Sequence, residues 1–188
     1  VLFEKEKTIK NAIGREAGKR RKFNSYIKEG LIFITKESLD VARILENKRL
    51  KGTSDLIKSC YERVLDFSKY FDNSRSYKFF GYRGQARLGL GVRERDKGKR
   101  KELLTEAYED LKKEVELLKG TNWNPSQLCS AIHELSIACD HLSKLDIEKR
   151  KKLEIINTGI DSFDFLDDPR FKNFNNEYNI LLNVSLED

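Results

Sequence analysis

Apolar residues recur at helical spacing along most of the chain. Side chains three, four and seven positions apart lie on one face of an α-helix, so each such series predicts a helix with a buried apolar face. Four series are regular enough to define helices. They are Leu56, Cys60, Val64, Phe67 and Phe71; Leu104, Ala107, Leu111, Val115 and Leu118; Leu128, Ala131, Leu135, Ala138 and Leu142; and Leu153, Ile156, Ile160 and Phe163.

The ends of these four helices carry signals of their own. Ser54 is a candidate N-cap for the first helix, and Gly120 is a candidate C-cap for the second. Asn124 and Pro125 suit the start of the third helix, because proline is tolerated in a first turn. The fourth helix is expected to stop near Pro169.

Weaker patterns predict further helices on either side. The expected ranges are 3–13, 23–50 (one helix, or two broken near Gly30) and 174–186. Turn dipeptides typical of sheet proteins are scarce, and short connections favour antiparallel neighbours. We therefore predict an all-α fold, an antiparallel bundle of stacked αα-hairpins that forms a single domain over residues 1–188. Flexible connections are expected only at 91–101 and 167–173.

Composition agrees with a soluble helical domain. The 188 residues are 38% hydrophobic and 36% charged, and no apolar run approaches the roughly 18 residues that a membrane span needs. The first residues show no signal-peptide pattern, so we expect a cytoplasmic protein without a membrane partner. Three cysteines, an odd number, occupy apolar helix positions. They predict buried thiols in a reducing compartment rather than disulfides or a zinc site.

The chain is basic, with a formal charge of +6 and a pI of about 9.1. Such a balance suits an anionic partner: a phosphopeptide, an anionic lipid or a nucleic acid. The clearest clusters of basic residues are 18–22 and 93–101, where loops and helix ends are expected. This distribution favours solvated surface over a dedicated polyanion site, so nucleic acid is not the expected partner.

Catalytic signatures are missing from the sequence. There is no glycine-rich phosphate loop and no nucleophile beside a base. The pair Gly89 and Gly91 is interpreted as the end of a helix, and His133 with His141 offers too few ligands for a metal. We predict a protein that is not an enzyme and that has no cofactor.

Polar residues at near-heptad spacing suggest a binding site instead. Lys36 and Arg43 are seven residues apart, and so are His133 and Asp140, which places each pair on one side of its helix. Arg87 lies on a helix between them in sequence. A pocket for a phosphorylated side chain requires cations and hydrogen-bonding groups. Here two helices would supply the cations and a third the hydrogen-bonding groups.

In this order and approximate spacing, the chain from about Leu31 onward resembles the 14-3-3 family. The resemblance implies an all-helical dimer that holds phosphoserine or phosphothreonine segments in an amphipathic groove. It implies that two helices grip the phosphate and that later helices bind the backbone of the ligand. The positions that correspond to the ligand-binding residues of the family are Lys36, Arg43, Arg87, His133, Asp140 and Ser185.

The sequence departs from the family pattern at several of these places. Leu88 stands where the family has a tyrosine, and His133 and Ser185 stand where it has asparagines. Arg83 could take the place of Arg87, which is one residue nearer its glycine than in the family. Residues 1–30, where the dimerisation helices are expected, are weakly similar, so an altered dimer or a monomer is expected.

Other interpretations of the same residues stay open. Lys36 and Arg43 also suit a solvated helix face, and Arg87 could pair with a carboxylate on a neighbouring helix. Residues 82–87 with 106–108 resemble a tetratricopeptide unit, which implies a scaffold that binds a partner helix without need of phosphate. A third class is a helical module that binds RNA or DNA through its basic loops.

Overall fold

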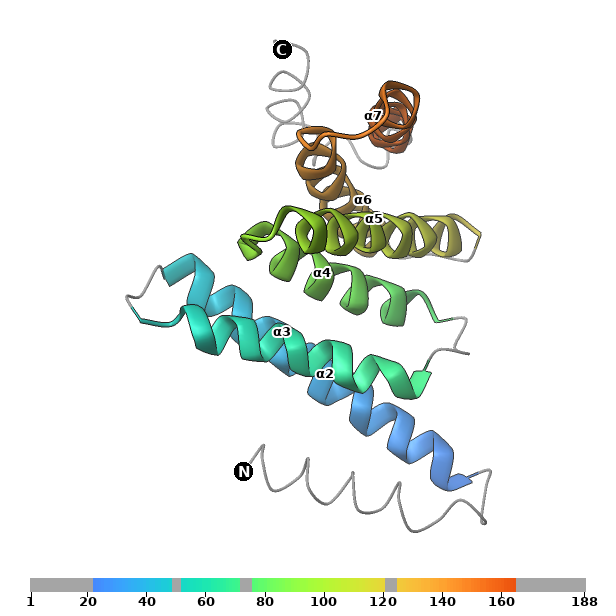
Figure 1. Cartoon of the computed structure of the whole chain (residues 1–188). Helices are drawn as coiled ribbons and strands as arrows, with labels where there is room; N and C mark the ends of the chain where they lie inside the picture. Colours follow the sequence, from blue (N-terminus) through green and yellow to red (C-terminus); the bar gives the residue numbers. More distant parts are fainter. Residues whose placement is uncertain (1–21, 49–51, 72–75, 121–124, 165–188) are drawn as a thin grey trace. The chain divides into compact units, whose positions relative to one another are not determined.

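The computed structural model describes residues 22–48, 52–71, 76–120 and 125–164, and the regular structure in these ranges is all helical (Figure 1). This confirms the prediction of an all-α fold. No helix within these ranges is both long and apolar enough to cross a membrane. The elements are α2 (Lys22–Lys48), α3 (Ser54–Ser68), η1 (Lys69–Phe71), α4 (Tyr77–Arg93), α5 (Lys97–Lys119), α6 (Pro125–Ser143) and α7 (Lys149–Asp164).

The chain divides into two compact units, residues 1–73 and 74–188. In the N-terminal unit α2 packs against α3, and the Tyr61 hydroxyl donates a hydrogen bond of 2.6 Å to Glu46 Oε1 across the pair. Helix α2 runs through Gly30 without a break, so the first of the two alternatives for this segment is correct. The single domain predicted for the whole chain stays a prediction.

Helix α3 starts and packs slightly differently from the sequence prediction. Its N-cap is Thr53 and not Ser54, which is already the first helical residue. Leu56 is 53% exposed, and Ile57 is buried in its place. The predicted series was therefore wrong at its first position, because a residue one step along the helix points inward there.

The C-terminal unit is built from α4, α5, α6 and α7, each packed against the next (Figure 1). Every residue of the two series predicted for α5 and α6 is buried, which confirms these two apolar faces. The Tyr77 hydroxyl donates to Gln127 Oε1 at 3.2 Å, so the first turns of α4 and α6 lie at the same end. Pro125 begins α6, as predicted.

Glycines set the distance between α4 and α5. A Cβ atom added at Gly81, Gly84 or Gly91 would lie less than 3.0 Å from a side-chain atom of Glu114, Leu111 or Leu104, respectively. Along α4 the contacts move forward from Gly81 to Gly91, while along α5 they move back from Glu114 to Leu104. The two helices are therefore antiparallel. Gly89 and Gly91 lie near the end of α4, so the pair does mark a helix end, but the C-cap is Glu94.

The connection between α4 and α5 is short. Only residues 94–96 separate the two helices, so most of the flexible connection predicted at 91–101 is helical. The carboxylate of Asp96 caps α5 by accepting a hydrogen bond of 2.8 Å from the backbone N–H of Lys99. At the other end Gly120 is the C-cap, as predicted, and its N–H donates to the carbonyls of Glu116 and Leu118.

Helix α7 closes the core of the C-terminal unit. Ile155 is buried in the core cluster, whereas Leu153, which the sequence pattern placed on the buried face, is 60% exposed. The Tyr108 hydroxyl on α5 donates to Thr158 Oγ1 on α7 at 3.0 Å. The segments predicted at 3–13, 167–173 and 174–186 lie outside the described residues.

All three cysteines are buried, as predicted, and carry free thiols. Burial raises the pKa of Cys60 and of Cys129. It raises the pKa of Cys139 to about 12, although Lys112 acts in the opposite direction. A buried thiol that keeps its proton is a small apolar side chain, consistent with a role in packing.

The close approach of α4 and α5 predicts that Gly84→Ala destabilises the protein. The added methyl group would lie 2.7 Å from Leu111 Cγ and 3.2 Å from Asp110 Cβ. Overpacking of this kind costs about 1–3 kcal/mol, which exceeds the roughly 1 kcal/mol of helix propensity that alanine adds. The measurement is the urea midpoint. Gly120→Ala is the control, because its nearest atom would be 3.6 Å away, and it should shift the midpoint little.

The buried thiols predict slow alkylation of the folded protein. At pH 9 iodoacetamide should modify Cys139 on the order of a hundredfold more slowly than in urea, because the thiolate is the reacting species. Unfolding returns the pKa of the Cys139 thiol to its ordinary value. Above pH 9 the unfolded chain therefore loses thiol protons before the folded protein does, and the free energy of unfolding should fall. Mass spectrometry of each cysteine peptide measures the rates. Equal rates in the folded and unfolded protein would contradict the burial.

Candidate functional site

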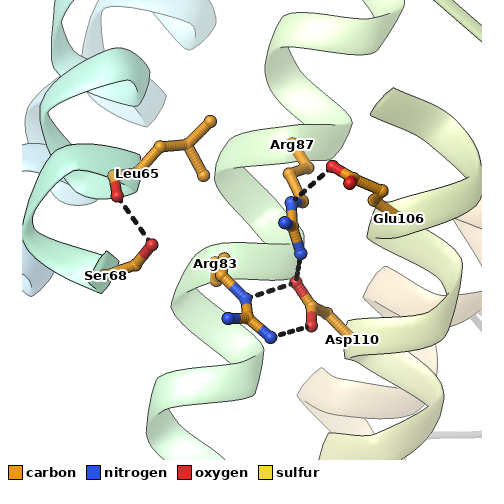
Figure 2. Close-up of polar contacts among 6 residues, drawn as sticks. All are labelled: Leu65, Ser68, Arg83, Arg87, Glu106 and Asp110. Atoms are coloured by element: carbon orange, nitrogen blue, oxygen red, sulfur yellow. Dashed lines mark hydrogen bonds and ion pairs between the residues drawn. The ribbon is translucent and has the colours of Figure 1, made fainter. Parts of the chain in front are cut away.

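Two arginines of α4 converge on one carboxylate of α5 (Figure 2). Arg83 binds Asp110 in bidentate fashion, with Nε 2.8 Å from Oδ2 and Nη2 2.6 Å from Oδ1. Arg87 donates from Nη1 to Asp110 Oδ2, and its Nε forms an ion pair with Glu106 Oε2 at 3.1 Å. We call these four residues the arginine cluster.

Helical spacing and the glycine contacts bring the cluster together. Arg83 and Arg87 are four residues apart, as are Glu106 and Asp110, so each pair lies on one side of its helix. The small side chains of α4 let the two backbones approach, and the antiparallel register then sets arginines opposite carboxylates. Because Gly84 lies one residue from Arg83, the tight packing and the ion pairs share one interface.

Aromatic rings further fix the first of these arginines. The Arg83 guanidinium carbon lies 5.4 Å from the centre of the Phe79 ring and 5.5 Å from that of Phe80. Cations over ring faces are attracted at these distances. Among the described residues, Arg83 is thus held by a carboxylate and by two rings, whereas the contacts of Arg87 are with two carboxylates.

The members of the cluster differ in their access to water. The Asp110 side chain is 6% exposed, and those of Arg83 and Arg87 are 17% and 20% exposed. Glu106 is 46% exposed. A buried carboxylate requires cationic partners, since its desolvation is otherwise costly. Asp110 is therefore a fixed structural partner, while Glu106 can turn into solvent at small cost.

The arrangement also shows what the guanidinium groups can offer a ligand. Arg87 uses Nε and Nη1 in the contacts described, and its Nη2 carries two further N–H donors. A phosphate oxygen approaching that edge would meet a cation whose position is already set. The formal charges of the four side chains cancel, so an added anion has to compete with Glu106.

Lys36 and Arg43 lie on α2, in the N-terminal unit. Lys36 Nζ is 2.6 Å from Asp40 Oδ2, an exposed pair one turn apart, and Arg43 is partly buried. Both side chains occupy the same side of α2, as their spacing predicts. Their convergence with Arg87 stays a prediction, as does their contact with a ligand.

His133 and Asp140 lie on one flank of α6 and are both partly buried. Asp140 pairs with Lys144 at 2.8 Å, and the backbone carbonyl of His133 accepts a hydrogen bond from the Ser136 hydroxyl. Ser185 lies outside the described residues. The contacts of these three positions with a ligand stay predictions.

The main partners of Arg87 were missed by the sequence analysis. Asp110 and Glu106 were not singled out, although a pairing of Arg87 with a neighbouring carboxylate was one of the open interpretations. The sequence does contain a signal for this pairing. Two basic residues four positions apart precede the connection between α4 and α5, and two acidic residues four positions apart follow it. Within the described ranges no group of histidine, cysteine and carboxylate side chains could hold a metal.

Comparison with family models, with curated proteins and with solved structures finds no match for this chain. The resemblance to the 14-3-3 family therefore rests on the residues quoted above, and family membership stays a prediction.

The buried carboxylate predicts a large effect of Asp110→Asn on stability. The amide cannot neutralise two guanidinium groups, and removing one partner of a buried ion pair costs about 3–5 kcal/mol, less here because the arginines reach water. We expect a loss of about 2–3 kcal/mol in the free energy of unfolding, measured by urea denaturation. The control is Glu116→Gln on the same helix. Its exposed pair with Lys113 should contribute less than about 0.5 kcal/mol.

Proposed function

We propose that this chain is a non-enzymatic adaptor that binds phosphorylated segments of partner proteins, with Arg87 as the residue that first contacts the phosphate. The observation that supports the proposal is the arginine cluster, in which two guanidinium groups are held side by side. Phosphate is recognised best by arginine forks whose orientation is already fixed. Lys36 and Arg43 are the further cations that the resemblance to the 14-3-3 family assigns to the same ligand.

Binding would proceed by exchange of anions at Arg87. A phosphorylated side chain carries nearly two negative charges and three acceptor oxygens, whereas Glu106 offers one charge and is half exposed. The phosphate can therefore replace Glu106, while Asp110 keeps both arginines oriented. Hydrogen bonds to charged groups contribute about 1.5–3 kcal/mol each, so a few of them supply much of the roughly 8 kcal/mol of a micromolar complex.

This exchange predicts opposite effects of two substitutions. Glu106→Gln should raise the affinity for phosphopeptides several-fold, because it removes the competing carboxylate. Arg87→Gln should lower it at least tenfold, because the fork is lost. The measurement is binding to a degenerate peptide mixture with a fixed central phosphoserine, and to the same mixture with serine. Unchanged binding by Arg87→Gln, with circular dichroism showing a folded protein, would exclude Arg87 as the phosphate ligand.

The contribution of the N-terminal unit is tested separately. Lys36→Glu and Arg43→Glu should together weaken phosphopeptide binding in the same assay, as the family resemblance implies. If they leave the affinity intact while Arg87→Gln lowers it, the phosphate site is confined to α4.

A second candidate function is a scaffold that binds a partner helix without phosphate. The observation that favours it is the packing of α4, α5, α6 and α7, each against the next, with glycines at the closest interface. Stacks of helical hairpins of this kind present extended surfaces to partner segments. Equal retention of the serine and phosphoserine mixtures would favour the scaffold.

A further inference from the structure

Two short segments of the C-terminal unit hold the basic excess of the whole chain. Residues 93–101 contain six basic and two acidic side chains, and residues 144–152 contain five and two. Together they carry a formal charge of +7, whereas the entire chain carries +6. The net formal charge of the remaining residues is therefore close to zero, although they include the basic cluster at 18–22.

The fold brings these two segments to one end of the C-terminal unit. The Lys101 ammonium on α5 donates a hydrogen bond of 3.1 Å to the backbone carbonyl of Asp146, in the connection between α6 and α7. Helix α5 begins at Lys97 and helix α7 at Lys149, within a turn of these two partners. Segments some fifty residues apart in sequence thus form one surface, which we call the basic end.

The surroundings of His141 also bring cations of the two segments together. Its pKa is lowered, chiefly because burial disfavours the charged imidazolium. Asp140 acts in the opposite direction, and Lys144 and Arg100 add to the lowering. Arg100 belongs to α5 and Lys144 follows α6, so cations from both segments act on one side chain.

Little of this charge is neutralised by the contacts observed at the basic end. Lys101 donates to a backbone carbonyl, which bears no formal charge, and Lys144 pairs with Asp140. The Asp96 carboxylate is engaged as the cap of α5. Nearly all of the cationic side chains are exposed, so the surface presents a strong positive potential to solvent.

We propose that the basic end binds duplex nucleic acid through its phosphates, largely without regard to sequence. The cations are distributed over two helix starts and a turn, as contact with a repeating row of phosphates requires, rather than gathered around one dianion. The described part of the C-terminal unit exposes no large aromatic side chain on which bases of a single strand could stack. Ile155 of α7 is buried in the core, and the exposed side chains around the start of that helix, Lys149 to Lys152, are cationic.

The test uses the full chain, three variants and fluorescence anisotropy. Two variants each remove three positive charges from one segment, and the third removes three positive charges from the opposite ends of α4 and α5. The substitutions, all to glutamine at exposed positions, are Arg95, Lys97 and Lys99; Lys149, Arg150 and Lys151; and, as the control, Lys78, Lys113 and Lys119. The probes are a 20-base-pair DNA duplex, the RNA duplex of the same sequence, the single strands, and vesicles of phosphatidylserine and phosphatidylcholine.

The expected result is that each segment variant binds the duplexes at least tenfold more weakly, whereas the control changes affinity less than about twofold. The slope of log K against log salt should become shallower by about 0.9 for each phosphate that a variant no longer neutralises. Stronger binding to the DNA or to the RNA duplex names the preferred form, and either supports the proposal. Equally weakened binding by all three variants, binding to vesicles only, preference for single strands, or no duplex binding at low salt would overturn it.

Discussion

The carboxylate of Asp110 is almost fully buried at the interface where α4 packs on α5. An isolated charge in that position would cost several kcal/mol, so the two arginines of α4 have to be present and correctly oriented. They can be, because glycine at position 84 brings the backbones close enough for both guanidinium groups to reach the same carboxylate. Packing and electrostatics at this interface therefore depend on one another.

The mutual dependence of packing and electrostatics at this interface also affects the proposed function. A site that holds its cations with buried carboxylates gains orientation and loses net charge. In the arginine cluster the balance differs between the two carboxylates, since Asp110 is buried and Glu106 is half exposed. In the proposed function, Asp110 stabilises the fold and Glu106 gives way to the ligand, so a cluster with no net charge could accept an anionic partner.

Much of the fold follows from the sequence, because the faces of α5 and α6 repeat at helical spacing without interruption. The pattern fails where other constraints act. Leu56 and Leu153 belong to the apolar series but lie near the starts of their helices, where the buried face is defined by the neighbouring helix. The prediction of a loop after Gly91 fails because charged residues suit loops and helices equally, and the capping role of Asp96 was not recognised.

The arginine cluster marks the limit of sequence reasoning at the site. Arg87 was found through family resemblance, but its partners depend on the register between α4 and α5. Gly81, Gly84 and Gly91 set that register, and the sequence pattern did not indicate this role for them. Helical periodicity identifies which residues share a face of one helix. It does not identify the residue opposite on the next.

The three-residue connection between α4 and α5 has a consequence for any encounter at that tip. Long charged loops lose conformational freedom when they bind, and this loss subtracts from affinity. Here the backbone that carries the cations is already wound into helical turns and capped, so only side chains remain to be immobilised. Such preorganisation favours rapid association steered by long-range attraction, with specificity left to other surfaces.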